Sequence, residues 1–543
     1  MQRISGRVVD VLNRREFPGT VEFSGGVIRR IRRDAKPKGR GLIMPGFVDA
    51  HIHIESSMLP PAEFARLAVV HGTVGTVSDP HEIANVLGVA GVDYMIADGR
   101  RTPFHFCFGA PPCVPATDNE TAGARLGPRA VARLLARPEV GYLSEVMNFP
   151  GVLRGDKALL AMIAAAVRRG KPIDGHAPGL RGAEAAAYAG AGISTDHECF
   201  TLAEANDKIL AGMKILIREG SAARNFEALA PLLKTNPGRC MFCCDDLHPD
   251  LLIQGHLDHH IRRALALGVD RFDAVACVTV NPIRHYGLRV GLLREGDPAD
   301  LVVVDGWRKF RVRRTYLAGR LAAKDGKSLL PRLQSRIVNR FRARSRKSAD
   351  FSVKLQPGKL RVIEALDGQL ITRSRLMKPK ASGGLAVADP SRDLLKIAVV
   401  NRYATRAPVG VGFIRGFGLK AGALASSVAH DSHNVVVVGA TDREMAEAAN
   451  LVIAHRGGVS VVGNGRHKVL PLEIAGLMAA GDGRTVARRY AELDALAKRL
   501  GSRLRAPFMT LSFMALLVIP DLKLSDRGLF SCAKWKFEPL FEG

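Results

Sequence analysis

The middle of the chain alternates between two patterns of apolar and polar residues. Short apolar runs rich in β-branched and aromatic residues are followed by Ala- and Leu-rich stretches with helical spacing, as in residues 61–72 and 129–139. This alternation is typical of βα units that build a parallel sheet. We count eight apolar runs, at residues 47–55, 72–82, 103–112, 140–148, 171–178, 191–198, 213–221 and 239–246. Eight such units predict a TIM-type (β/α)8 barrel.

The pattern differs on either side of this region. Residues 1–45 contain short strand-like runs separated by turn residues, and a similar texture returns at residues 298–327. We therefore expect a small β domain built from both ends of the barrel segment. A chain of 543 residues is too long for one ordinary core, which agrees with a division into two or three domains.

Composition narrows the class of protein. The hydrophobic fraction of 47% is that of a globular protein. We expect no membrane span, because no run of about 18 apolar residues occurs, and no signal peptide, because the first residues lack an apolar core. The eight cysteines are scattered and do not form the framework of a small secreted fold. The simplest interpretation is a protein of the reducing cytoplasm.

The formal charge of +27 allows two interpretations. A basic surface is typical of nucleic-acid-binding proteins, and the charge is densest at residues 307–380. The alternative is an enzyme with a basic, solvated surface. No aromatic stacking motif and no helix-turn-helix pattern accompanies the charge, so we favour the enzyme and expect no nucleic-acid partner.

Ionisable residues lie near the ends of most of the predicted strands. They are His51, His53, His81, Glu145, His176, His197 and Asp245. The reactive face of a TIM-type barrel is the carboxyl end of its strands, where these side chains would meet. His51 and His53 share one face of a strand, so both are predicted to point into the barrel mouth. Imidazoles held there without an acid partner favour a metal ion, and the later carboxylate and histidines strengthen that prediction.

Several of these motifs resemble the amidohydrolase superfamily and, within it, the adenine deaminase family. The motifs are PGFVDAHIHIESS, SDPHEIANVLG, DGHAPGL, TDHECFT, ILIREGSAARN, FCCDDLHPD, GLKAGALASSVAHDSHN and VIPDLKLSDRGLF. The resemblance covers nearly the whole chain. One departure is Cys244, which precedes the Asp pair where a small polar residue is expected, and we do not expect it to affect metal binding. The resemblance implies a barrel at residues 46–289, a small β-sandwich domain of residues 1–45 and 290–330, and a C-terminal α+β domain at residues 340–543.

The resemblance also implies a site for two divalent metal ions. His51 and His53 would bind one ion with Asp245, and His176 and His197 would bind the other. Glu145 would bridge the two ions. This ligand set contains nitrogen and oxygen but no thiolate, which suits Zn²⁺, Mn²⁺ or Fe²⁺. The resemblance favours Mn²⁺ or Fe²⁺.

The reaction that the resemblance implies is hydrolysis of adenine to hypoxanthine and ammonia by a metal-bound hydroxide. Adenine would be the small-molecule partner, and we expect a homo-oligomer, as a dimer. Asp245 is the hypothesised proton shuttle, although it would otherwise serve only as a metal ligand. His81 and Glu82 are the hypothesised partners of the ring nitrogens, with support of the metal ligands as their alternative role.

Other residues allow more than one interpretation. Arg218 and Ser221 would contact the purine, or an Arg218–Glu219 pair would only brace the barrel. Asp246 replaces Asp245 as the ligand if the strand register is shifted by one residue. His430, Asp431 and His433 look like ligands, but a loop held by local hydrogen bonds would have the same residues. Cys240 and Cys243 form a CxxC motif without the preceding residues of a zinc-dependent cytidine-type deaminase.

The residues by themselves leave two rival functions open. The first is another amidohydrolase, acting on a different aminopurine or a cyclic amide. The second is a nucleic-acid-binding protein that uses the basic region at residues 307–380. A set of metal-type residues at a barrel mouth has no purpose in a pure binding protein, which argues against the second.

Overall fold

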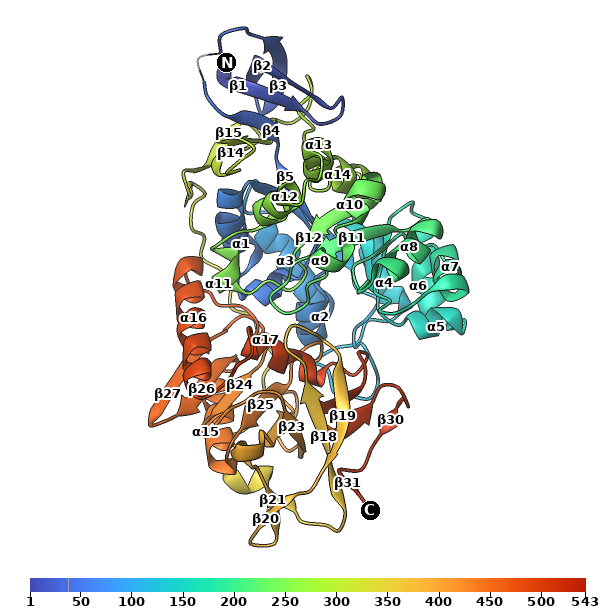
Figure 1. The fold of residues 1–543 in the computed structure, drawn as a ribbon, viewed down its shortest axis with the longest axis vertical. Coiled ribbons are helices and arrows are strands. Elements are labelled where there is room, and N and C mark those ends of the chain that lie inside the picture. The colour runs from blue at the N-terminus through green and yellow to red at the C-terminus, as the bar shows by residue number, and fades with distance from the viewer. Residues whose placement is uncertain (38) are drawn as a thin grey trace.

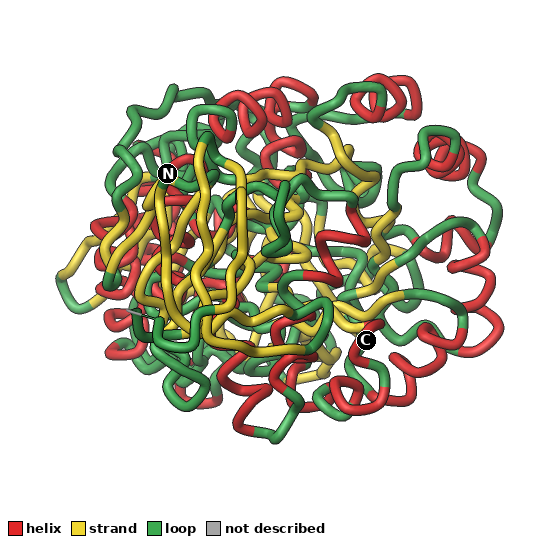
Figure 2. Tube along the Cα trace, turned by 90° about the horizontal axis from the view of Figure 1, so that it is seen from above, coloured by secondary structure: helices red, strands yellow, loops and turns green. Residues whose placement is uncertain are grey.

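A computed structural model describes residues 1–37 and 39–543 of the chain. The N-terminal strands lie at one end of the elongated molecule and the C-terminal half at the other, with the predicted barrel segment between them (Figure 1). In the perpendicular view, strands run through the interior and many of the helices lie at the rim (Figure 2). Within the described part of the chain, no helix has both the length and the apolar character needed to cross a bilayer.

Each of the eight predicted runs contains a strand. Five form one parallel sheet in the order β5-β6-β7-β8-β9, and three form a second in the order β10-β11-β12. Their bounds are β5 Phe47–Ile52, β6 Thr73–Ser78, β7 His105–Ala110, β8 Val140–Val146, β9 Ile173–Gly175, β10 Thr195–Asp196, β11 Lys214–Arg218 and β12 Cys240–Cys243. The predicted α/β class with parallel strands is confirmed.

The helices between these strands follow the predicted helical spacing. In α4, for example, Val131, Leu134 and Leu135 are buried on one side while Arg133 is exposed. The helices are α1 Pro61–Ala68, α2 His81–Leu87, α3 Val89–Gly99, α4 Pro128–Leu135, α5 Phe149–Leu153, α6 Lys157–Val167, α7 Gly182–Gly190, α8 Leu202–Leu210, α9 Phe226–Leu229, α10 Leu232–Thr235, α11 Pro249–Leu252, α12 Leu257–Ala266, α13 Arg271–Ala276 and α14 Val280–Tyr286. Strands β5, β6 and β12 are buried along their full length, as expected for parallel strands covered on both faces.

The two parallel sheets meet at both of their edges. The Ser194 N–H donates to the Ile173 carbonyl at 2.9 Å, which joins β9 to the segment entering β10. At the other edge, the Asp245 N–H donates to the His51 carbonyl at 3.0 Å and the His53 N–H donates to the Asp245 carbonyl at 3.2 Å. The carboxyl ends of β5 and β12 therefore lie side by side.

Strands from both flanks of this region form one further sheet. Its order is β16-β15-β14-β13-β4-β1-β2-β3, so residues near position 40 pair with residues near position 300. The bounds are β1 Gln2–Asp10, β2 Arg15–Ser24, β3 Val27–Arg33, β4 Leu42–Pro45, β13 Leu301–Val304, β14 Val312–Leu317, β15 Arg320–Lys324 and β16 Lys327–Ser328. Its apolar side chains, among them Phe23, Ile43 and Val303, form a separate buried cluster.

The C-terminal half is built on a nine-stranded sheet. The order is β19-β18-β23-β22-β25-β24-β26-β27, with β31 paired to β18. The bounds are β18 Lys359–Ala365, β19 Thr372–Met377, β22 Leu395–Val400, β23 Val409–Arg415, β24 Ala423–Ser426, β25 Val435–Gly439, β26 Gly458–Gly463, β27 Arg466–Pro471 and β31 Phe541–Glu542. Helix α15 (Asp442–Ala454) packs on this sheet, α16 (Gly483–Arg499) contacts β26 and β27, and α17 (Pro507–Ser512) contacts β24 and β25.

Candidate metal centre

The six residues predicted to bind metal are brought together at the carboxyl ends of the parallel strands. His51 lies in β5 and Glu145 in β8, whereas the other four follow their strands by one or two residues. All six are at least 94% buried. We call this group the metal cluster; its members are His51, His53, Glu145, His176, His197 and Asp245.

Three of its members meet where β5 and β12 adjoin. The Oδ1 atom of Asp245 lies 3.5 Å from His51 Nε2 and 3.3 Å from His53 Nε2. Asp245 has a φ of +54°, in the left-handed region that non-glycine residues seldom adopt. Asp246 lines the same cavity, where its Oδ1 atom accepts a hydrogen bond from the Ser56 hydroxyl and lies 3.7 Å from His430 Nε2.

The Glu145 carboxylate lies between the two parts of the metal cluster. Its Oε1 atom is 3.3 Å from His53 Nε2. Its Oε2 atom is 2.6 Å from His176 Nδ1 and 3.4 Å from His197 Nε2. One oxygen therefore faces the histidines of the first strand and the other faces those of the fifth and sixth strands.

The donor atoms of the metal cluster fit divalent cations. His53 Nδ1 lies 3.3 Å from the Asp79 carbonyl oxygen, and donating to it leaves the Nε2 lone pair directed into the cluster. That lone pair faces His51 Nε2 at 3.2 Å. His51 Nδ1 has no hydrogen-bond partner among the described residues. Imidazole nitrogens that converge with carboxylate oxygens are a ligand set for Zn²⁺, Mn²⁺ or Fe²⁺.

Buried charges keep both carboxylates of the metal cluster ionised. Burial by itself raises the pKa of Asp245, but the Arg218 guanidinium outweighs it and holds that pKa well below its usual range. For Glu145, burial is outweighed mainly by the His176 imidazole, which lowers the carboxyl pKa. Metal ligands must be deprotonated, so both groups are ready to bind a cation at neutral pH.

The two residues predicted to contact the purine take different places. Arg218 is 1% exposed, and its Nη1 atom donates to Asp245 Oδ2 at 2.6 Å and to Glu198 Oε1 at 2.5 Å. The Ser221 hydroxyl accepts the His248 N–H at 2.8 Å, and Ser221 does not line the cavity at the metal cluster. These contacts favour a positioning role for Arg218 and a structural role for Ser221. Glu219 pairs with Arg263 rather than with Arg218.

His81 and Glu82 begin α2 rather than ending a strand, yet both reach the metal cluster. His81 Nδ1 lies 3.0 Å from Asp79 Oδ2 and 3.4 Å from Glu145 Oε1. Its Nε2 atom lies 3.4 Å from Glu82 Oε1. The His81 ring therefore connects the bridging position of Glu145 to Glu82.

Two histidines of the C-terminal half hold both oxygens of Glu82. They lie in the connection between β24 and β25. His430 Nδ1 donates to Glu82 Oε1 at 2.5 Å, and His433 Nε2 donates to Glu82 Oε2. His433 Nδ1 accepts the Ala429 N–H at 3.1 Å, which leaves its proton on Nε2. Burial raises the pKa of the Glu82 carboxyl, but the two imidazoles outweigh it and lower that pKa well below its usual range.

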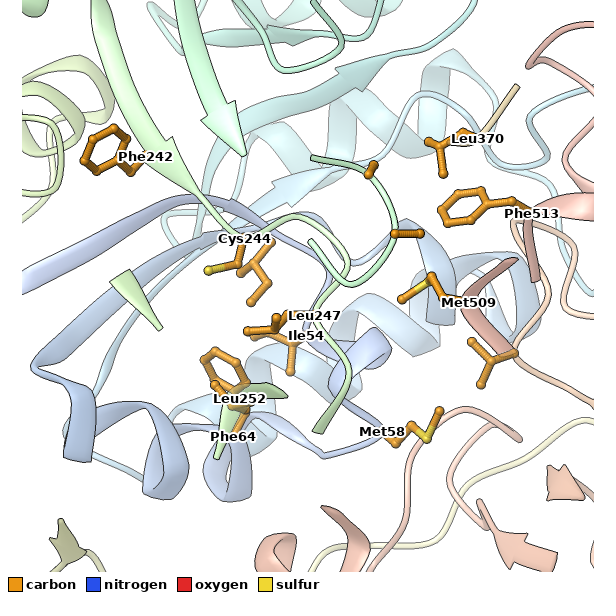
Figure 3. Close-up of a cluster of buried hydrophobic side chains, with 14 of the residues drawn as sticks. Ile54, Met58, Phe64, Phe242, Cys244, Leu247, Leu252, Leu370, Met509 and Phe513 are labelled. Carbon is orange, nitrogen blue, oxygen red and sulfur yellow. The ribbon is translucent and has the colours of Figure 1, made fainter. Parts of the chain in front are cut away.

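The metal cluster opens into a small cavity with an apolar wall. Leu370, Phe513, Leu516 and Ile519, all from the C-terminal half, line it together with members of the metal cluster. The His430 and Phe513 rings stack with centroids 4.4 Å apart and 14° between their planes. Leu370 and Phe513 lie next to each other in Figure 3. The cavity itself has a volume of about 20 Å³, room for one water molecule, so binding of a flat ring ligand would require this wall to move outward.

Sequence reasoning missed three contributors to this site. Asp79 and Glu198 are fully buried carboxylates that touch His81 and Arg218, respectively. Each stands close to a predicted residue, Asp79 two positions before His81 and Glu198 directly after His197, which is a signal that could have been used. The apolar wall carried no such signal, because its members come from segments about 140 residues apart.

Comparison with known proteins agrees with the motifs. Residues 42–322 match the amidohydrolase family, and residues 369–536 match the adenine deaminase C-terminal domain. The chain is 57% identical to the adenine deaminase of Salinibacter ruber, over 99% of this chain and 98% of that protein. It is 50% identical to the adenine deaminase of Methanosarcina acetivorans over the full length of both. N-acetyl-D-glucosamine-6-phosphate deacetylase from Mycobacterium smegmatis overlays 60% of this chain and all of its own, with a TM-score of 0.45 and 17% identity.

Proposed function

This chain belongs to the adenine deaminase family of amidohydrolases, and we propose that it hydrolyses adenine to hypoxanthine and ammonia. The observation that carries the proposal is the Glu145 carboxylate, whose two oxygens face His53 on one side and His176 and His197 on the other. Such a bridge is what a site for two cations requires. The apolar residues that line the same cavity support a planar purine as the ligand.

We propose that His51, His53 and Asp245 hold one divalent cation, that His176 and His197 hold the other, and that Glu145 is shared. Mn²⁺ or Fe²⁺ is the proposed metal, and Zn²⁺ suits the same ligands. When bound, the cations supply an activated water, because coordination lowers the pKa of water from about 15.7 towards 7. This chain's own residues would move the protons and orient adenine.

Asp245 is the proposed proton shuttle. Its Oδ1 atom faces His51 and His53, on the side of the proposed cation, and its Oδ2 atom accepts a hydrogen bond from Arg218. The Asp245 carboxylate would accept a proton from the attacking water. The amino group of adenine leaves only as neutral ammonia, and therefore needs a proton at the 6-amino nitrogen. Asp245 would deliver it. Arg218 fixes the orientation of the carboxylate, while Glu198 offsets part of the guanidinium charge.

His81 and Glu82 are the proposed partners of the purine ring. Attack at C6 needs a proton or a hydrogen bond at N1, which the cavity-lining His81 would supply, while the ionised Glu82 would accept a hydrogen bond from a ring N–H. The proposal is supported by the hydrogen bonds from His430 and His433, which fix the Glu82 carboxylate in one position. The stacked His430 and Phe513 rings would contact the purine and orient it against the apolar wall.

We also propose the architecture that accompanies this function. The eight parallel strands would close into one (β/α)8 barrel, which is supported by the hydrogen bonds at both edges of the two sheets. The shared sheet of residues 1–45 and 290–330 would form the small β-sandwich domain, and residues 340–543 the C-terminal domain. Assembly as a homodimer remains a prediction.

A substrate panel tests the proposed function. The purified protein, loaded with Mn²⁺, is incubated with adenine, other aminopurines and cyclic amides, and both ammonia and the ring product are measured. We expect the highest kcat/KM for adenine, with hypoxanthine and ammonia formed in equal amounts. Faster hydrolysis of a cyclic amide, or no ammonia from adenine, would contradict the proposal.

A further inference from the structure

A second group of possible metal ligands lies beside β5 and β12, apart from the metal cluster. It consists of Asp49, Cys244 and His256, whose side-chain donor atoms all lie within 4.8 Å of one another. The three residues are 0%, 1% and 2% exposed, respectively. Neither the proposed reaction nor the metal cluster uses them. We call this group the thiol cluster.

In the thiol cluster, the Asp49 carboxylate and the His256 imidazole each have hydrogen-bond partners on one side only. Asp49 Oδ1 accepts the His51 N–H at 3.2 Å and the Cys244 N–H at 3.1 Å. His256 Nδ1 lies 2.6 Å from the Thr73 hydroxyl. The opposite atoms, Asp49 Oδ2 and His256 Nε2, have no hydrogen-bond partner in the described part of the chain. Both atoms are buried, where an unsatisfied polar group is destabilising.

These two unsatisfied atoms nevertheless approach each other to 3.1 Å. At this distance they form an ion pair if His256 is protonated, but they do not form a hydrogen bond. Two ligands of one tetrahedral zinc ion have a similar spacing, since Zn–N and Zn–O distances are about 2.0–2.2 Å. A metal-bound histidine commonly has its other ring nitrogen fixed by an oxygen, as Thr73 does here for His256.

The third member is one of two adjacent cysteines on opposite faces of the strand. The Cys243 side chain packs with Ala50, Tyr142 and Met241 in one buried cluster. Cys244 belongs instead to the main core, where it lies near Leu247 and Ile54 (Figure 3). Cys244 alone therefore shares the face of Asp49 and His256, and Cys243 provides a natural control.

A cavity gives the thiol cluster an open side. It has a volume of about 660 Å³ and is lined by Cys244 and His256, together with Glu219, His259 and His260. A site with three protein ligands leaves one coordination position of a tetrahedral ion for water. Asp49 does not line the cavity, so Cys244 and His256 are the two members through which an ion or a water would reach the cluster.

We propose that Asp49, Cys244 and His256 form a third cation site, for a thiophilic divalent ion such as Zn²⁺ or Cd²⁺. On binding, the Cys244 thiol loses its proton to solvent and a metal–sulfur bond forms, with no change of oxidation state. The thiolate distinguishes this site from the metal cluster, whose ligands are nitrogen and oxygen only. Cations that prefer oxygen, such as Mn²⁺, would bind the metal cluster and leave the thiol cluster free.

Titration with Cd²⁺ tests the proposal on the full-length protein already loaded with Mn²⁺. The readout is the ultraviolet charge-transfer band of a thiolate bound to Cd²⁺, which the metal cluster cannot produce. We expect the band to saturate at one Cd²⁺ per chain, to disappear in C244S and to persist in C243S. His256→Gln should weaken Cd²⁺ binding by at least roughly tenfold.

A band that persists in C244S, or a wild-type protein without the band at stoichiometric Cd²⁺, would overturn the proposal. A variant that fails to fold does not block the test, because cadmium NMR of the wild-type protein gives an independent result. The proposal requires a resonance with the chemical shift of Cd²⁺ that is bound by one sulfur together with nitrogen and oxygen ligands. Resonances only in the range of nitrogen and oxygen ligands would contradict it. Neither outcome depends on the proposed deaminase activity.

Discussion

The parallel-strand region and the C-terminal half contribute to the same buried site in different ways. The parallel-strand region, residues 46–289, supplies every member of the metal cluster, from positions in or just after hydrogen-bonded strands. The C-terminal half supplies His430, His433 and Phe513, which lie in a loop and in a short 3-10 helix. The two regions would therefore have different roles in the site. The strand ends would hold the cations, and the C-terminal half would fix Glu82 and enclose the purine.

The largest effect is expected from Asp245→Asn, which removes the proposed shuttle and leaves the shape of the side chain. We expect kcat to fall about 10²- to 10⁴-fold, the usual contribution of general acid–base catalysis. Most of the bound metal should remain, since the histidines are unchanged. Steady-state ammonia release and metal analysis of the same sample measure both quantities.

Asp246→Asn is the matched control for this variant. Asp246 contacts Ser56 rather than His51 or His53, so its substitution should reduce kcat less. Near-normal turnover of D245N would remove the shuttle from the mechanism. Greater loss of metal in D246N than in D245N would show that Asp246, and not Asp245, belongs to the metal cluster.

The next largest effect is expected where the C-terminal half meets Glu82. His433→Ala leaves one Glu82 oxygen without its donor, and we expect kcat to fall about 10- to 100-fold with the metal content unchanged. His467→Ala serves as the control, because His467 lies on the exposed surface of the same sheet and pairs with Glu447. Equal kcat values for the two variants would show that the hydrogen bond from His433 to Glu82 does not support catalysis.

A smaller effect is expected for the apolar wall. Phe513→Ala removes an aromatic face that would stack on the purine, and such stacking contributes about 1–3 kcal/mol per base. We expect KM for adenine to rise roughly tenfold, with a smaller change in kcat. Phe537→Ala, at a side chain that is 41% exposed in the same half, should leave both parameters unchanged. A fall in kcat without a change in KM would argue against substrate binding at this wall.

The smallest effect concerns stability where the two regions meet. Burial, reinforced by the Asp431 carboxylate, raises the pKa of Glu120 well above its usual range. The folded chain therefore keeps a proton that the unfolded chain releases above about pH 4.3, so folding stability falls as the pH rises from that value towards the folded pKa. Glu120→Gln, which resembles the neutral acid, should show a smaller fall in Tm between mildly acidic and neutral pH. An unchanged pH dependence of Tm would mean that Glu120 is ionised in the folded protein.

Much of the parallel-strand region could be predicted from the sequence, because the residue patterns that specify its strands and helices are local. Apolar runs separated by helical stretches predicted all eight strands, and the ionisable residues near the ends of most of them, together with the family resemblance, predicted the members of the metal cluster. The choice between Asp245 and Asp246 could not be made this way. It depends on which carboxylate faces His51 and His53 in the folded chain, and Asp245 is the one that does.

The contribution of the C-terminal half could not be predicted from residue patterns. Glu82 and its partner His433 are 351 positions apart, and only the packing of the two regions brings them together. The same holds for Leu370 and Phe513, which look like ordinary core residues in the sequence. The histidines of the β24–β25 connection were singled out, but a hydrogen-bonded loop was an equally good interpretation of them.

The most direct test of the account is metal analysis coupled to activity. Purified protein is assayed for bound metal and for ammonia release from adenine, before and after treatment with a chelator, and again after Mn²⁺ is restored. We predict about two divalent cations per chain at the metal cluster, loss of activity with their removal and recovery with Mn²⁺. Full adenine deamination by protein that holds no divalent metal would contradict the account.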